Sequence, residues 1–133
     1  MKRILTSILF LLVIMCSYAQ TKRYYCEVKG IENEHSGLKI ILDFGNQASY
    51  NMWGDLSDKL KFVDEKNGKV IKFNSMVDAA NYMVEKGWQF QQAYSSTYRG
   101  NPIIHWIFYK DAKSIEKAKE GIMTKEEYNK SHK

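Results

Sequence analysis

Short segments in which hydrophobic and polar residues alternate run through most of the chain, and this alternation is typical of β-strands with one buried face. It is clearest over residues 38–44, where side chains of one face are all apolar. The segments that predict strands are residues 24–29, 38–44, 59–63, 69–73, 88–94 and 103–110. Both faces of the last segment are largely apolar or aromatic, which predicts a central strand or one covered by the C-terminal segment. Asn67-Gly68 predicts a tight turn, because both residues tolerate positive φ, whereas residues 30–37 and 95–102 predict longer loops.

The spacing of apolar residues changes to a helical period over residues 75–86. The residues that share one stripe of this segment are Met76, Val77, Ala80, Met83 and Val84. Ser75 predicts the N-cap, with Asp78 returning a hydrogen bond to the cap amide as in a capping box. Gly87 predicts the C-terminal end, because glycine readily adopts the left-handed conformation. We therefore expect one main helix that packs on a face of the sheet.

The C-terminal residues 111–133 are charged and helical in composition, and Thr124 with Glu127 predicts another capping box. All these elements together predict an α+β fold, with an antiparallel sheet of five or six strands, one main helix packed on a face and a C-terminal helix. The predicted organisation is a signal peptide over residues 1–19, an α+β domain over residues 20–110 and a C-terminal helical tail over residues 111–133.

The first residues of the chain have the pattern of a secretory signal peptide. Lys2 and Arg3 give a positively charged start, a mainly apolar run follows, and small residues stand three positions and one position before Gln20. Cleavage before Gln20 predicts an exported protein, in the periplasm or outside the cell. The apolar run is too short for a spanning helix, which takes about 20 residues, so we expect no transmembrane helix in the mature chain.

A lipoprotein is the alternative interpretation of the same segment. Cys16 follows the apolar residues Val13 and Ile14, as the modified cysteine of a bacterial lipoprotein would. Met15, however, occupies the position that normally holds Gly, Ala or Ser in the lipidation motif. Simple cleavage is therefore the preferred interpretation, with lipidation at Cys16 as the alternative.

The distribution of charge does not indicate a nucleic-acid partner. The whole chain has a formal net charge of +5, from 20 basic and 15 acidic residues, and loss of Lys2 and Arg3 on cleavage lowers this charge to +3. Basic and acidic residues are interleaved, as in residues 116–120. Dispersed charge of this kind is typical of a solvated surface, so no nucleic-acid binding is expected.

The sequence carries no recognised catalytic or metal-binding motif, such as a glycine-rich phosphate loop, His-Glu-x-x-His, a paired-cysteine motif or Gly-x-Ser-x-Gly. Cys26 is the only cysteine of the mature chain, and its alternating segment places it on the apolar inner face of a strand. His105 is the only histidine on its predicted strand and is expected to form structural hydrogen bonds. No catalytic residue, metal ligand or cofactor is therefore predicted, and whether the protein is an enzyme stays open.

Aromatic residues make up 14% of the chain, more than the predicted core requires. Tyr50, Trp53 and Tyr98 fall in predicted loops and form a candidate binding surface, because exposed aromatic side chains contribute strongly to interfaces. The preferred function is a secreted, non-enzymatic binding or protein-interaction module. The sequence does not identify its partner, and a peptide, a glycan and a second copy of the chain are the candidates. The alternative is a small thiol-dependent enzyme or hydrolase that uses Cys26 and His105.

One block of the sequence, residues 73–110, follows a pattern of a Phe-x-Ser start, a helix, Gly-Trp-x-Phe and a strand rich in aromatic residues. The residues that carry this pattern are Phe73, Ser75, Asp78, Ala79, Asn81, Tyr82, Met83, Gly87, Trp88, Phe90, Gln92, Ala93, Tyr94, His105, Trp106 and Lys110. In these positions the chain resembles a family of small secreted bacterial domains of unknown function. The resemblance implies a helix packed on an antiparallel sheet and export in a Gram-negative cell, and it implies no activity.

Residues 119–128 resemble a short helical tail found at the ends of many bacterial proteins, which is thought to help association. The residues that carry this resemblance are Gly121, Thr124, Glu126, Glu127 and Tyr128. The last of these departs from the pattern, because phenylalanine is usual there. The resemblance implies a role of the tail in self-association.

Overall fold

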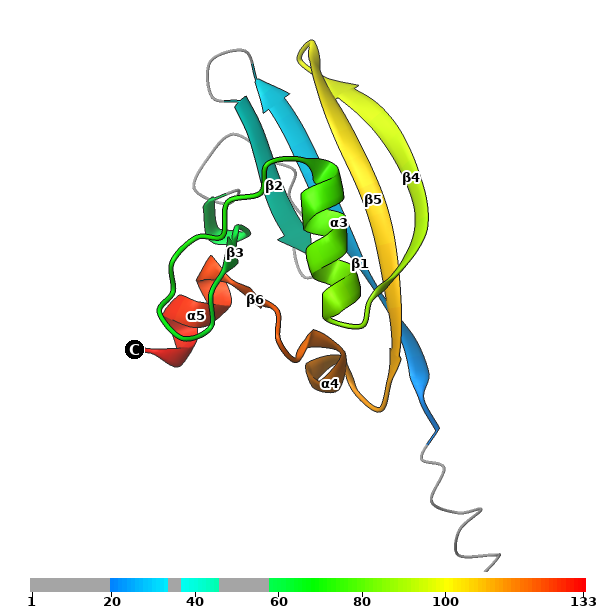
Figure 1. Ribbon diagram of the computed structural model, residues 1–133, viewed down its shortest axis with the longest axis vertical. Coiled ribbons are helices and arrows are strands. Elements are labelled where there is room, and N and C mark those ends of the chain that lie inside the picture. Colours follow the sequence, from blue (N-terminus) through cyan, green and yellow to red (C-terminus); the bar gives the residue numbers. More distant parts are fainter. Residues whose placement is uncertain (1–19, 34–36, 46–57) are drawn as a thin grey trace, which may run out of the picture.

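A four-stranded antiparallel sheet with an α-helix on one face organises the protein (Figure 1). The computed structural model describes residues 20–33, 37–45 and 58–133. The strands of this sheet, in spatial order, are β2 (Gly37–Asp43), β1 (Lys22–Asn33), β5 (Asn101–Ala112) and β4 (Gln89–Tyr98). The helix on the sheet is α3 (Met76–Glu85). The C-terminal elements are α4 (Ile115–Lys119), β6 (Met123–Thr124) and α5 (Lys125–Ser131), and β6 pairs with β3 (Phe62–Val63).

The predicted α+β class is confirmed, but the strands are arranged differently from the prediction of one sheet with five or six strands. The described residues form one sheet of four strands and another of two. In the predicted hairpin around Gly68, only β3 is a strand, and the segment after the turn contributes a single bridge between Val63 and Val70. The tail takes the place of that segment, because β3 pairs with β6 and the Lys125 N–H donates to Lys61 O at 2.9 Å.

The turn at Gly68 forms as the sequence predicts. Gly68 has a φ of +66°, and its N–H donates to Asp64 O at 2.8 Å. The ring of Tyr128, from α5, lies directly against Gly68, where a Cβ atom would overlap with it. Both the backbone conformation and this close approach therefore require glycine.

The boundaries of α3 follow from the predicted capping residues, with one difference. Ser75 Oγ accepts from the Asp78 N–H at 3.1 Å, and Gly87 has a φ of +82°. The Asp78 carboxylate, however, accepts from the Asn74 N–H at 2.9 Å, one residue before the predicted cap amide. At the other end, Lys110 Nζ donates to the Lys86 carbonyl at 2.8 Å, where a cation stabilises the free carbonyls of a helix C-terminus.

The C-terminal segment forms two short helices around β6 instead of the single helix that was predicted. The capping box of Thr124 and Glu127 is present at the start of α5. Ala118 and Ile122 are buried in the same hydrophobic cluster as Trp88 of the main domain. The tail therefore contributes side chains to the core of the sheet and helix.

The hairpin of β4 and β5 replaces most of the loop predicted over residues 95–102. Its turn consists only of Arg99 and Gly100, which have φ values of +50° and +81°. Two consecutive residues with positive φ are the mark of a type I′ turn, whose twist matches that of the flanking strands. Both strands therefore continue to the turn, and β5 lies centrally between β1 and β4, which is one of the two positions that its apolar faces predicted.

The two faces of the sheet differ in chemistry. We call the face covered by α3 the helix face; it carries Cys26 and Phe108, which lie opposite each other on β1 and β5 in the main hydrophobic cluster. We call the opposite face the distal face; it carries Lys29 opposite His105 on the same two strands. Apolar side chains thus hold the helix to one face, while charged and polar side chains occupy the centre of the other.

Candidate functional site

The strand β4 is an edge of the sheet, with β5 as its only neighbour among the described residues. Its ten residues read QFQQAYSSTY, every one of them is exposed, and none is charged. Edge strands in natural proteins are usually blunted by charged residues, proline, bulges or short length, since their unpaired backbone groups attract other strands. The strand β4 has a single bulge, between Phe90 and Gln92, at its beginning. Its remaining length is an open, uncharged edge.

The tight turn determines which backbone groups of β4 face outward. Tyr98 and Asn101 flank the two-residue turn, and a pair in this position exchanges both backbone hydrogen bonds. Hydrogen-bonded and outward-facing residues alternate along an antiparallel edge strand. The backbone N–H and C=O groups of Ala93, Ser95 and Thr97 therefore point away from β5, toward a strand that could be added.

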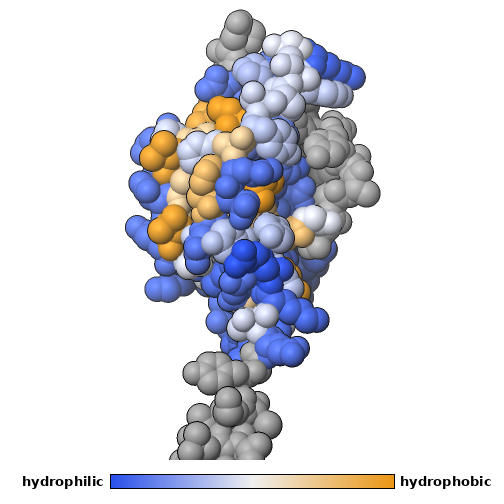
Figure 2. All heavy atoms as spheres, turned by 90° about the vertical axis from the view of Figure 1, so that its right-hand side faces the viewer, coloured by the Kyte–Doolittle hydropathy of each residue, from blue (hydrophilic) through white to orange (hydrophobic). Residues whose placement is uncertain are grey.

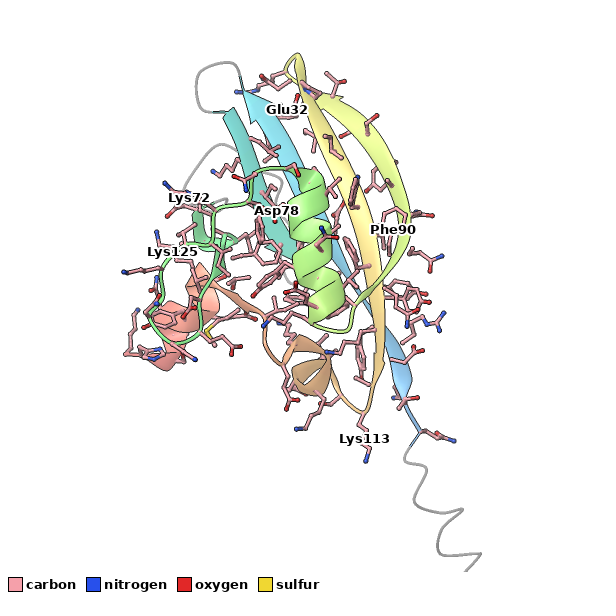
Figure 3. All side chains as sticks on the ribbon, in the orientation of Figure 1. Glu32, Lys72, Asp78, Phe90, Lys113 and Lys125 are labelled. Carbon is pink, nitrogen blue, oxygen red and sulfur yellow. The ribbon has the colours of Figure 1, made fainter. Side chains whose placement is uncertain are left out.

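Three large aromatic side chains of β4 are partly exposed. Phe90 is 50% exposed, Tyr94 is 47% exposed and Tyr98 is 38% exposed. Phe90, labelled in Figure 3, lies on the helix face, with its ring 5.5 Å from that of Trp106. Tyr94 and Tyr98 lie on the distal face, because Tyr94 is paired with His105. Apolar area is therefore available on both sides of the open edge.

The exposed surface of α3 adds to the apolar area on the helix face. Val77 and Val84 of α3 are both more than half exposed. Figure 2 looks onto the β4 side of the molecule and shows hydrophobic residues gathered in its left half, the side on which α3 lies. The apolar surface beside β4 thus combines residues from the strand and from the helix.

The distal face holds a cluster of charged residues around a buried lysine. The Lys29 ammonium lies 2.9 Å from Glu27 Oε2 and 2.9 Å from Asp43 Oδ2, and the residue is only 4% exposed. These residues come from β1 and β2, and alternation of side chains brings them to the same face. Two carboxylates around one ammonium compensate for the removal of its charge from water.

His105 connects this charged cluster to the open edge. Its Nδ1 lies 2.6 Å from Glu27 Oε1, and its Nε2 lies 2.7 Å from Ser96 Oγ. The imidazole is 4% exposed and stacks on the ring of Tyr94, with centroids 4.4 Å apart and planes inclined by 4°. The Tyr94 hydroxyl donates to the same Glu27 oxygen at 2.9 Å. A continuous set of polar contacts therefore runs from β2 to β4 across the distal face.

The pKa values in the cluster follow from these contacts. Burial by itself raises the pKa of Glu27, but hydrogen bonds from Lys29 and His105 outweigh burial, and the pKa is lowered from its ordinary value. Burial by itself lowers the pKa of Lys29, but hydrogen bonds to Asp43 and Glu27 outweigh it and raise the pKa. Both groups therefore stay charged over the physiological pH range.

Of the three residues predicted as a binding surface, only Tyr98 belongs to the described part of the chain. Tyr50 and Trp53 lie outside the described residues. Tyr98 lies at the end of β4, next to the turn, in a strand instead of the predicted loop. Phe90, Tyr94 and Ser96 were not predicted as site residues. The absence of charge over residues 89–98 was the signal in the sequence that could have identified the edge.

Cys26 and His105, the pair proposed from the sequence as an alternative catalytic site, are not brought together. Cys26 is buried on the helix face, as predicted, whereas His105 lies on the distal face. Burial also raises the pKa of the Cys26 thiol, which disfavours the nucleophilic thiolate. The structural hydrogen bonds predicted for His105 are present.

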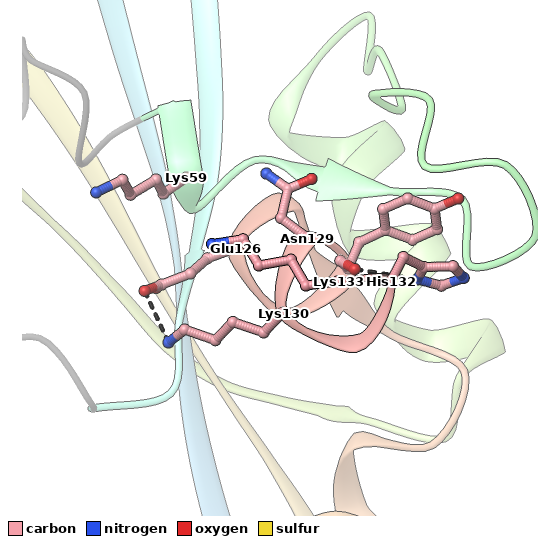
Figure 4. Close-up of a pocket in the computed structure, with 7 residues that line it drawn as sticks. Lys59, Glu126, Asn129, Lys130, His132 and Lys133 are labelled. Atoms are coloured by element: carbon pink, nitrogen blue, oxygen red, sulfur yellow. Dashed lines mark hydrogen bonds and ion pairs between the residues drawn. The ribbon is translucent and has the colours of Figure 1, made fainter.

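Several hollows lie on the surface of the described residues. Figure 4 shows one of about 570 Å³ beside α5, where Lys130 pairs with Glu126 at 2.8 Å. Another, of about 520 Å³, runs beside β2 and includes Lys39, Lys61 and Lys72 in its lining. Within the described parts of the chain, no group of three or more metal-ligating side chains converges, and no helix is both long and apolar enough to cross a membrane.

Comparison with known proteins gives no match: no family model, no curated protein and no solved structure is similar to this chain.

Proposed function

We propose that this protein is an interaction module that binds an extended segment of a partner polypeptide as an additional strand along β4. One observation carries the proposal: β4 is a ten-residue edge strand that is exposed throughout and has no charged residue. Strand addition uses the free backbone groups of such an edge for affinity and the neighbouring side chains for specificity.

The chemistry of β4 indicates the kind of segment that it would bind. The outward backbone groups of Ala93, Ser95 and Thr97 would pair with the partner backbone, irrespective of its sequence. Side chains of an added strand alternate between the two faces, where Phe90 and Tyr94 offer aromatic area on opposite sides. A partner segment that is extended, uncharged and rich in aromatic or β-branched residues would fit this edge best.

The proposed setting is the periplasm or the exterior of the cell, after cleavage before Gln20. This part of the proposal rests on residues 1–19, which lie outside the described residues. Mass spectrometry of the protein from an expressing bacterium tests it. A mature N-terminus at Gln20 is the expected result, whereas a lipid-modified N-terminus at Cys16 would identify the lipoprotein alternative.

A peptide titration tests strand addition directly. The probe is a capped peptide with the sequence of residues 89–98, because an uncharged edge can pair with its own sequence. Ser95→Pro removes one outward N–H without removing a hydrogen bond to β5, and Ser95→Ala is the matched control. Isothermal titration calorimetry should show binding to the wild type and Ser95→Ala, and at least about tenfold weaker binding to Ser95→Pro. Equal binding by the two variants, or no binding by any of the three proteins, would contradict the proposal.

A further inference from the structure

We propose that Ser96, His105 and Glu27 form an acyl-transfer site that hydrolyses carboxylic esters at the distal side of β4. This activity is separate from the proposed binding of a strand, since it depends on side chains of the distal face.

The three residues have the spacing of a nucleophile, a general base and a group that orients the base. Ser96 Oγ lies 2.7 Å from His105 Nε2, and His105 Nδ1 lies 2.6 Å from Glu27 Oε1. Both distances fall within the reach of about 2.6–3.2 Å that proton transfer requires. The residues come from three adjacent strands, β4, β5 and β1, so the sheet itself holds them in line.

The surroundings of Glu27 favour the protonation state that such a site needs. Lys29 and the Tyr94 hydroxyl both donate to Glu27, which keeps the carboxylate ionised and fixed. An ionised carboxylate accepts the hydrogen of His105 Nδ1, and this tautomer leaves Nε2 free to accept the hydroxyl proton of Ser96. Tyr94 also stacks on the imidazole and limits its rotation. Glu27 and Tyr94 are therefore positioning residues in this proposal.

The position of Ser96 makes the nucleophile accessible and indicates the substrate class. The imidazole is buried, but Ser96 is exposed on the edge strand. Tyr94 and Tyr98 lie two residues before and after it on the same face, and both are partly exposed. These rings would contact a flat apolar group, so the expected substrate is an ester of a small acyl group with an aromatic alcohol.

The reaction would proceed in two steps that balance without a cofactor. Ser96 Oγ attacks the acyl carbon while its proton passes to His105 Nε2, and the negative charge develops on the former carbonyl oxygen. The bond from the acyl carbon to the alcohol oxygen breaks, and the proton on Nε2 passes to the departing alcohol. Water then attacks the acyl-serine, His105 takes a proton from the water and returns it to Ser96, and the carboxylic acid leaves.

Labelling with a fluorophosphonate probe tests the nucleophile. Ser95 and Ser96 are adjacent but lie on opposite faces of β4, so Ser95→Ala is a matched control for Ser96→Ala. Mass spectrometry should find the probe on Ser96 in the folded wild type and in Ser95→Ala. These two proteins should also hydrolyse para-nitrophenyl acetate faster than Ser96→Ala does. We expect Ser96→Ala to slow both reactions by about 10²-fold or more. No labelling of the folded wild type, labelling at another residue, or equal rates for the two variants would overturn the proposal.

Glu27→Gln tests the role of the positioning carboxylate. A glutamine amide can donate to Nδ1 and so favour the tautomer with the proton on Nε2, which cannot accept from Ser96. With folding verified by circular dichroism, we expect slower labelling whose rate rises with pH more steeply than that of the wild type. A variant that labels at the wild-type rate, or more slowly with an unchanged pH profile, would contradict this role.

Discussion

The two edges of the main sheet are built in opposite ways. At one edge, β2 is seven residues long, carries Lys39 and Asp43, and donates from the Leu42 N–H to Leu60 O at 3.0 Å. At the other edge, β4 is longer, uncharged and exposed throughout. The first edge is protected by charge and by a backbone partner, while the second has no charged residue and pairs only with β5 among the described residues. A protein that protects one edge and leaves the other open has a surface suited to strand addition.

The polar cluster of the distal face contains charged groups near the β2 edge and neutral hydroxyl groups at the β4 edge. It begins at the β2 edge with the ion pair of Asp43 and Lys29 and ends at the β4 edge with the hydroxyl groups of Tyr94 and Ser96. Charge is therefore concentrated at the protected edge and central strands, and neutral polar groups are found at the open edge. The contrast separates residues that stabilise the fold from residues that are available for binding or reaction.

The largest expected effect on stability is at the protected edge. Asp43→Ala removes one of the two carboxylates that the described residues place around the buried ammonium of Lys29, and breaking a buried pair in this way costs about 3 kcal/mol. Urea unfolding should therefore show a decrease of about this size in the free energy of unfolding. The matched change at the open edge, Ser95→Ala, should stay within about 0.5 kcal/mol. Equal effects of the two substitutions would contradict the contrast between the edges.

The pH dependence of stability should depend on Glu27, in the centre of the cluster. Its pKa is lowered in the folded protein, so its contribution to stability is fully present above the unfolded value of about 4.3 and is lost as the pH falls through the folded value. The free energy of unfolding, measured in urea between neutral pH and pH 3, should fall less steeply in Glu27→Gln than in the wild type. Parallel pH profiles of the two proteins would show that Glu27 does not have this role.

A smaller effect is expected where the cluster reaches β4. Tyr94→Phe keeps the ring that stacks on His105 but removes the hydroxyl that donates to Glu27, and a hydrogen bond of this kind contributes about 1 kcal/mol. Tyr98→Phe is the control on the same face and should change the free energy of unfolding by less than about 0.5 kcal/mol. A loss in the control as large as that in Tyr94→Phe would assign the effect to general packing of the tyrosines.

The smallest effect on stability, and a large effect on binding, is expected from a charge placed on the open edge. Ser95→Lys introduces at β4 the charge that protects natural edge strands, on a strand whose residues are all exposed. Its thermal unfolding should match that of the wild type, while its affinity for the peptide of residues 89–98 should fall. Unchanged peptide affinity would show that the edge is not where the peptide binds.

The features that the sequence predicted correctly are local ones. The main helix begins after Ser75 and ends before Gly87, because capping residues act within one turn of the helix. Gly68 likewise forms its turn through contacts with residues close to it in the sequence. The prediction of a loop over residues 95–102 was wrong. It rested on Gly100 and Pro102, which are residues typical of loops. Pro102 lies beyond the last pair of β1 with β5, which is Ile31 with Ile103. Its missing N–H therefore removes no hydrogen bond between these two strands.

The polar cluster could not be predicted in the same way, because it depends on the pairing of distant strands. Glu27 and His105 are separated by 78 residues, and only the register of β1 with β5 brings them within 2.6 Å. A shift of one residue would move either side chain to the opposite face of the sheet. The pairing of β3 with β6 was missed for a similar reason, since the two-residue β6 has no alternating pattern of its own.

Amide hydrogen exchange measured by NMR tests the open edge most directly. In the free protein, the account predicts slow exchange at Leu42, whose outward N–H is bonded to Leu60 O, and fast exchange at Ser95 and Thr97. Saturation with the peptide of residues 89–98 should slow exchange at Ser95 and Thr97 and leave Leu42 unchanged. Protection of Ser95 and Thr97 in the free protein equal to that of Leu42, or exchange that the peptide does not alter, would contradict the central claim that β4 is an open binding edge.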